Sequence, residues 1–325
     1  MTASTQVGTQ AANGTAPTSA RRRSADGGTR VRAGNASAPY LFLAPFMIIF
    51  GVFVLVPAVY GIWMSLHNWD FFLPERPWVG LGNYLELFDP TSLTAVQFWE
   101  SMRATGLFVL FSVPFLVVIP LGLALMLNRV FPGRTFFRAV YFAPYVLGVA
   151  VIGVLWQNLL NANVGLINYY LGRLGVTEII PWLTATPWVW VTLVGVTVWW
   201  TLGFNAVVYL AGLQGIDTTL YEAARVDGAS RWHEFWHVTL PGLRPVLLFV
   251  VTITILASAN MFGQSYLLTG GAPSNETRTA IMYIAQTGFE QFRMGRAAAM
   301  SYILCLLLIG ISALNFLLFR RQEKN

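Results

Sequence analysis

Charge is scarce in this chain. Only 10% of its 325 residues are Asp, Glu, Lys or Arg, whereas a soluble domain carries about 25%. A surface with so few charges cannot mostly face water, which excludes an ordinary soluble domain. The single cysteine, Cys305, lies within an apolar run, so an intrachain disulfide is excluded and no redox compartment is indicated. The net charge of +6 does not indicate a nucleic-acid partner, because the basic residues lie mainly between apolar runs.

The chain contains several long apolar runs. Hydrophobic residues make up 56% of the chain, and a helix of about 20 apolar residues crosses a bilayer core of ~30 Å. The sequence therefore predicts an all-α membrane protein with six transmembrane helices, embedded in the lipid bilayer as a multi-pass protein. The spans are expected at residues 40–65, 104–128, 137–160, 186–213, 243–268 and 298–319.

The positions of the basic residues indicate the orientation. Most of the 20 Lys and Arg lie in the N-terminal tail, after the second and fourth spans and at the C-terminus, which predicts that both termini are cytoplasmic. Residues 1–38 are rich in Ala, Thr, Gly and Ser and are predicted to form a disordered cytoplasmic tail. The apolar run that follows is too long for a signal peptide. Residues 39–325 are then the membrane domain, with a cytoplasmic loop at about 214–242.

That loop contains the stretch HEFWH, residues 233–237, which matches the zinc-protease pattern H-E-x-x-H. Two histidines four residues apart on a helix can share a zinc ion, with the glutamate as general base. A catalytic zinc site also needs a third protein ligand, and the only other histidine, His67, is predicted on the opposite side of the membrane. A membrane zinc metalloprotease is therefore a remote alternative, and no metal ligand is assigned.

The loop is predicted to form two short helices joined by a turn. Thr219 and Glu222 have the spacing of a capping box, so the first helix is expected to begin near Leu220. Gly228 is suited to the left-handed residue that ends it.

The second helix is expected from Arg231 to His237, with Ser230 as its cap, and to end before Pro241. Its apolar face, toward the helix bundle or a partner, is formed by Trp232, Phe235, Trp236 and Val238.

At this point the sequence resembles a known family. Glu222-Ala223-Ala224, then Gly228, then Leu240-Pro241 have the spacing of the EAA loop of ABC importer permeases, with Val238 in the place of the usual isoleucine. The longer stretch 221–229 is similar to the carbohydrate-importer subfamily of the maltose and glycerol-phosphate type. Residues 43–45, 79–84 and 267–273 (LAP, VGLGNY and LLTGGAP) also resemble that subfamily. Two departures are Ile216-Asp217, where the family has I-P, and residues 262–266, where it often has F-D-x-I-Y.

The resemblance implies a type I ABC importer permease fold, a location in the cell (inner or cytoplasmic) membrane, and a transport subunit without catalytic residues. Such a chain forms half of the translocation pore for a carbohydrate, or alternatively for glycerol-phosphate or another polar solute. The implied partners are a second homologous permease, two cytoplasmic ABC ATPase subunits and an extracytoplasmic solute-binding protein. No cofactor is expected on this chain, because ATP and Mg are implied on the partner ATPase. The residues implied to couple to that ATPase are Tyr221, Glu222, Ala223, Ala224, Arg225, Asp227, Gly228, Leu240 and Pro241.

Polar and aromatic residues within the spans are candidates for the solute path. Polar groups are costly in lipid and are expected to face an interior or a cavity. The candidates are Asn205, Asn260, Gln264, Trp199 and Tyr145. The alternative for each is hydrogen bonding between helices or packing at the membrane interface. Pro114 and Pro120 are expected to kink the second span.

Overall fold

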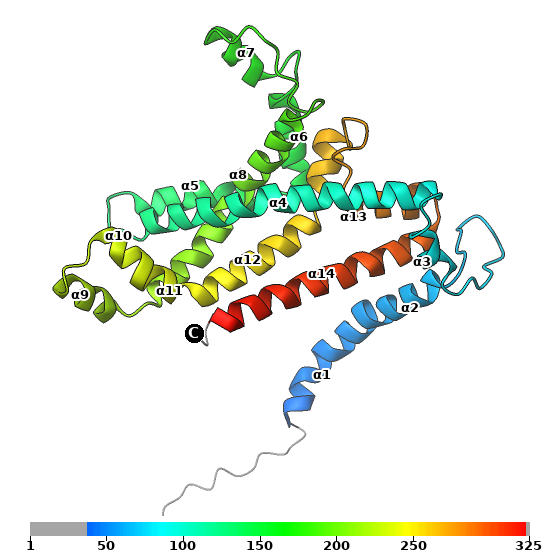
Figure 1. Cartoon of the computed structure of the whole chain (residues 1–325), viewed down its shortest axis with the longest axis horizontal. Helices are drawn as coiled ribbons and strands as arrows, with labels where there is room; N and C mark the ends of the chain where they lie inside the picture. Colours follow the sequence, from blue (N-terminus) through cyan, green and yellow to red (C-terminus); the bar gives the residue numbers. More distant parts are fainter. Residues whose placement is uncertain (1–37, 323–325) are drawn as a thin grey trace, which may run out of the picture. The chain divides into compact units, whose positions relative to one another are not determined.

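The computed structural model describes residues 38–322, and their regular secondary structure is helical (Figure 1). Within this range no strand forms, and only two isolated bridges join extended residues, His67 with Trp78 and Asp70 with Arg293. The predicted tail lies outside the described residues, apart from Ala38. The chain divides into two compact units, residues 1–55 and 56–325. In the first, α1 (Ala38–Phe50) continues into a π-helical turn, η1 (Gly51–Leu55).

The second unit contains the remaining helices. In chain order they are α2 (Val56–Ser65), α3 (Gly82–Glu86), α4 (Leu93–Leu127), α5 (Arg134–Val146), α6 (Val149–Leu159), α7 (Leu166–Arg173), α8 (Trp188–Gln214), α9 (Thr218–Val226), α10 (Arg231–Glu234), η2 (Phe235–Thr239), α11 (Leu240–Gly242), α12 (Arg244–Ala259), η3 (Ser265–Thr269), α13 (Ala280–Ala285), η4 (Gln286–Glu290) and α14 (Met294–Gln322).

Four helical segments of the described chain are long and apolar enough to cross a membrane: Tyr40–Ser65, Leu93–Leu127, Trp188–Gln214 and Met294–Leu317. Two bent pairs pass the same criterion when each pair is taken together, which gives up to 6 spans. The first pair is α5 with α6, bent by 97°, and the second is the segment 231–242 with α12, bent by 69°. The all-α membrane class is confirmed.

The predicted third span, residues 137–160, differs most from the structure, because it is two helices instead of one. Leu147 and Gly148 are both extended, with ψ of 137° and 150°, and they separate α5 from α6. An extended residue cannot continue the helical hydrogen-bond ladder, so its carbonyl needs another donor. The indole N–H of Trp200 on α8 supplies it to the Leu147 oxygen at 3.1 Å. The break is thus stabilised by a neighbouring helix.

Two other spans differ at their ends. The second begins at Leu93 instead of residue 104, so α4 extends through 35 residues. The α-helix of the fifth ends at Ala259, before the predicted residue 268, because Asn260 caps it and a π-helical turn, η3, follows after a short interval.

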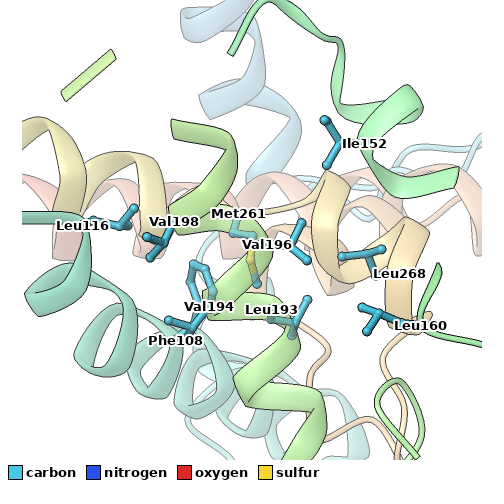
Figure 2. Packing of buried hydrophobic residues seen from close by; sticks show 10 residues of the cluster. All are labelled: Phe108, Leu116, Ile152, Leu160, Leu193, Val194, Val196, Val198, Met261 and Leu268. Carbon is cyan, nitrogen blue, oxygen red and sulfur yellow. The ribbon is translucent and has the colours of Figure 1, made fainter. Parts of the chain in front are cut away.

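The core lies where α8 packs against α4 and where α6 packs against η3. Figure 2 shows apolar side chains of α4 and α8 close together with Met261, and Ile152, Leu160 and Leu268 to the right of them. The cluster consists of Phe108, Leu116, Ile152, Leu160, Leu193, Val194, Val196, Val198, Met261 and Leu268. A second cluster, at the other end of α8, includes Tyr209, Leu213 and Leu243. Tyr221 and Val238 pack against this second cluster, so the loop 214–242 rests directly on the ends of the long helices.

Candidate functional site

The first helix of the loop, α9, begins at a cap that differs from the prediction. Asp217 has extended backbone angles, and its carboxylate accepts a hydrogen bond from the Thr219 backbone N–H at 2.9 Å. Asp217 is therefore the N-cap, and the predicted capping box of Thr219 and Glu222 is wrong, because the helix has already begun at Thr218. Hydrogen bonds from the Thr219 backbone and hydroxyl lower the pKa of the Asp217 carboxyl, so the cap is charged at neutral pH.

The turn after α9 has the predicted form. Gly228 has a φ of +78°, and its N–H donates to the Arg225 oxygen at 3.0 Å. The N–H of Ala229 donates to the Ala224 oxygen at 2.9 Å. These two bonds are those of a Schellman motif, in which a left-handed residue lets the chain reverse and satisfies the last carbonyls of the helix. The prediction for Gly228 is confirmed.

The second helix of the loop is longer than expected. The Ser230 hydroxyl accepts a hydrogen bond from the His233 N–H at 3.3 Å, so the predicted cap is confirmed. The prediction that the helix ends before Pro241 is wrong, because α10 continues through η2 into α11. In the π-helical turn η2, the Leu240 N–H donates to the Phe235 oxygen, five residues back. A proline inside a regular α-helix lacks a donor and crowds the preceding turn, and a π-helical turn opens the spacing just before it.

Two side-chain contacts hold the two arms of the loop together. Arg225 Nε lies 2.9 Å from Glu234 Oε1 in an ion pair. The Tyr221 hydroxyl lies 3.0 Å from the Thr239 hydroxyl, which is buried against the helix ends. Glu222 is exposed, as is Ala223. The loop thus has one side on the bundle, with Glu222 and Ala223 on its accessible side.

The HEFWH stretch lies in the second arm. The His233 and His237 rings stack with centroids 4.2 Å apart, and Glu234 is paired with Arg225 instead of facing a metal position. His67 is buried elsewhere, with Nδ1 2.7 Å from the Trp63 oxygen. Between residues 38 and 322 no group of three or more His, Cys, Asp or Glu side chains could hold a metal ion. A third zinc ligand is therefore not found near the motif.

The predicted apolar face of this arm is divided. Val238 packs on the bundle, whereas 69% of Trp232 and 48% of Trp236 are exposed. Trp232 stacks on Phe235, with centroids 5.9 Å apart. The exposed tryptophans are available to a partner or to lipid.

A large cavity runs along α4 and α8. Its volume is about 1070 Å³. The walls are mostly apolar and include two tryptophans, and three charged residues lie toward one end. Its lining includes Glu100, Arg103, Leu107, Phe111, Trp190, Val194, Trp199 and Glu276. The Glu276 carboxylate accepts a hydrogen bond from the Thr186 hydroxyl at 2.5 Å.

Of the five predicted solute-path residues, only Trp199 lines this cavity, where it packs edge-on against Trp156. Asn260 caps α12 and lies in a separate groove between α12 and α14. Gln264 is half-buried, and Tyr145 stacks on Phe204 with centroids 4.9 Å apart.

Sequence reasoning missed Glu100, Arg103 and Glu276. A signal existed for the first two, because charges three residues apart lie on one face of a helix. Both lie outside the predicted second span, which begins only at residue 104.

Asn205 has a structural partner. It is buried on α8, and its side-chain nitrogen donates to the Leu116 oxygen of α4 at 2.9 Å. In a regular helix that oxygen would accept from residue 120, which here is Pro120 and has no N–H. The amide of Asn205 therefore satisfies a carbonyl left unpaired by the proline and ties α8 to α4.

We expect Asn205→Leu to lower stability by about 1–3 kcal/mol, because the Leu116 carbonyl would be left buried without a donor. Thermal unfolding of the purified protein in detergent measures this. Asn205→Gln, which keeps the amide, is the matched control and should lose less. Equal stability of Asn205→Leu and the wild type would contradict the assignment.

The chain matches the family described as "Binding-protein-dependent transport system inner membrane component" over residues 105–324. It is 33% identical to the trehalose/maltose transport system permease protein MalF of Thermococcus litoralis, covering 87% of this chain and 94% of that protein. It is 32% identical to the sn-glycerol-3-phosphate transport system permease protein UgpA of Agrobacterium fabrum, with the same coverage of 87% and 94%.

Chains of two solved ABC transporter structures are also similar to this chain. A bacterial ABC transporter involved in the import of the acidic polysaccharide alginate has a chain that is 26% identical, with a TM-score of 0.73, covering 87% of this chain and 95% of that one. A second structure, of a bacterial alginate ABC transporter in complex with an alginate pentasaccharide-bound periplasmic protein, gives 25% identity and a TM-score of 0.75 over 88% and 95%. With this fold and the family match over most of its length, the chain belongs to the inner-membrane permease components of binding-protein-dependent ABC transport systems.

Proposed function

We propose that this chain forms one half of the membrane pore of an ATP-driven carbohydrate importer. A second homologous permease completes the pore, two cytoplasmic ABC ATPase subunits bind ATP and Mg, and an extracytoplasmic solute-binding protein delivers the solute. The alginate transporter in complex with its periplasmic protein supports the last of these partners by analogy.

Six spans with both termini in the cytoplasm are part of the proposal. The four long apolar helices and the two bent pairs support that count. The break between α5 and α6 suits a transporter, because broken helices are tolerated in membranes where they line a cavity or are covered by neighbouring helices. Of the second bent pair, α12 is placed in the membrane and residues 231–242 belong to the loop. The loop 214–242 is then cytoplasmic.

Coupling to the ATPase is assigned to this loop, and its rigidity supports the proposal. The Schellman turn at Gly228 and the Arg225–Glu234 ion pair fix the two arms relative to each other. Tyr221 and Val238 pack on the cluster at the end of α8, so a push on the exposed side of the loop is passed to the bundle as a rigid-body movement.

The charge of the cavity favours a neutral sugar over glycerol-phosphate. Trp190 and Trp199 offer aromatic faces of the kind on which sugar rings stack, and the charged end offers hydrogen-bonding groups for hydroxyls. That end has two carboxylates, Glu100 and Glu276, against one guanidinium, Arg103. A phosphate ester entering there would meet a net negative charge, whereas an uncharged carbohydrate would not.

Reconstitution of the chain with its proposed partners in proteoliposomes tests the proposal. We expect ATP-dependent uptake of a carbohydrate from a labelled panel, with no uptake when the binding protein is omitted. Trp199→Ala should reduce uptake by about tenfold through loss of stacking, and Trp188→Ala, outside the lining, is the matched control. Uptake of glycerol-phosphate in preference to every sugar would assign the alternative cargo, and ATP-independent uptake would contradict the importer.

A further inference from the structure

A second pocket lies between the loop 214–242 and the ends of the long helices. Its volume is about 590 Å³, within the range of about 300–1,000 Å³ typical of ligand sites and much larger than one phosphate ion. The last turn of α4, the end of α8 and both arms of the loop form its walls. They are lined by Leu125, Asn128, Arg129, Leu213, Tyr221, Arg225, Arg231, Trp232, Glu234, Phe235 and Thr239.

The pocket is basic. Three arginines line it against one carboxylate, Glu234, which is already paired with Arg225 at 2.9 Å. Arg129 and Arg231 have no carboxylate within ion-pair distance among residues 38–322. A further guanidinium, that of Arg138, donates to the Leu127 oxygen at 3.0 Å and adds positive charge beside the pocket at the end of α4. The site is thus built for an anion.

The donor type favours a phosphate. A guanidinium presents a planar fork of donors that matches the oxygens of a phosphate group. The arginines lie on different elements, with Arg129 just after α4 and Arg231 at the start of α10, and both line one pocket. The Asn128 side chain lines the same wall and offers an additional amide donor.

The apolar part of the site indicates a lipid. Trp232 and Phe235 stack on each other and form one wall, and tryptophan is enriched at the depth of lipid headgroups. Met126 and Val130 do not line the pocket, but they follow the lining residues Leu125 and Arg129 in the chain; 68% and 88% of them are exposed, which leaves apolar surface for an acyl chain. A free phosphate would use the arginines but not these apolar surfaces.

We propose that this pocket binds the headgroup phosphate of an anionic phospholipid in the cytoplasmic leaflet, with Arg129 and Arg231 as its ligands. The side of the membrane rests on the orientation given in the proposed function. A lipid held there touches α4, α8 and both arms of the coupling loop at once, so lipid composition would bias how firmly the loop is seated on the bundle.

To test the proposal, the purified full-length chain in nanodiscs of phosphatidylcholine is titrated with nitroxide-labelled phosphatidylglycerol, and the affinity for the labelled lipid is measured. The loss of one arginine near a membrane surface is expected to weaken lipid binding about fivefold. The double variant Arg129→Gln with Arg231→Gln should therefore weaken it about 25-fold. Arg244→Gln is the matched control, because Arg244 is exposed beyond the same end of the bundle and does not line the pocket. The lysine pair, R129K with R231K, keeps the charge but lacks the planar fork of donors, so it should recover part of the binding.

Two results would overturn the proposal. Arg244→Gln weakening binding as much as the pocket variants would mean that general surface charge is responsible. Displacement of the labelled lipid by an equal concentration of inorganic phosphate would mean that the pocket takes free phosphate instead. The binding assay uses no ATPase and no binding protein, so its failure is distinguishable from a failure of ATP-driven uptake.

Discussion

Replacing Gly228 by valine is expected to reduce ATP-driven uptake to background. Gly228 has a φ of +78°, and a β-branched residue in that conformation is strained by more than the ~1–2 kcal/mol typical of other L residues. No atom lies within 4 Å of an added Cβ, so the effect comes from the backbone and not from a clash within this chain. The Schellman bonds to Ala224 and Arg225 would be lost, and the two arms would change their angle. Uptake and ATP hydrolysis by the reconstituted complex measure the effect.

Two controls separate coupling from folding. Gly228→Asn should retain much of the activity, because asparagine tolerates the left-handed region. Gly133→Val places the same residue at another positive-φ glycine (+85°), where the nearest atom to an added Cβ is 3.9 Å away, and it should leave coupling intact. ATP hydrolysis that continues without uptake in Gly228→Val identifies uncoupling, and loss of both identifies failed assembly. Undiminished uptake in Gly228→Val would refute the coupling role of this turn.

Local signals in the loop were readable from sequence because they depend on neighbours in the chain. Gly228 is the only glycine between the two helices, and Ser230 precedes the second, so turn and cap follow from short-range chemistry. The first cap was misplaced because Asp217 and Thr219 are both good capping residues, and only the backbone conformation decides between them. The passage of the second helix through Pro241 depends on a π-helical turn, which no composition rule indicates.

Features that depend on packing could not be predicted in the same way. Hydropathy found the run 137–160, but the break at Leu147 is stabilised by Trp200, a residue 53 positions away. Asn205 was correctly expected to avoid lipid. Its hydrogen-bond partner is the Leu116 carbonyl, which has no helical donor because residue 120 is a proline. Asn205 and Pro120 each stand out in the sequence, but the contact that relates them could not be predicted. The cavity combines residues from α4, α8 and the segment after η3, and its charged end lies outside the span boundaries that hydropathy indicated.

Replacing Gly203 by alanine is expected to cause a large loss of stability. It lies on α8 where α5 crosses it, and an added Cβ would lie 2.5 Å from Phe142 Cα and closer still to the Tyr141 oxygen. Both are backbone atoms, so no side chain can rotate away. Gly203→Ala must therefore separate the two helices, at a cost of about 1–3 kcal/mol typical of overpacking. Thermal unfolding in detergent measures the change.

The same helix supplies a control of opposite sign. Gly195 lies two turns earlier on α8, and nothing lies within 4 Å of its added Cβ. Gly195→Ala should therefore stabilise the protein by up to about 1 kcal/mol, because alanine favours the helix over glycine. Opposite shifts at two glycines of one helix would show that the effect at Gly203 comes from the crossing with α5, since helix propensity acts equally at both. Equal stabilisation by both substitutions would mean that α5 and α8 do not approach this closely.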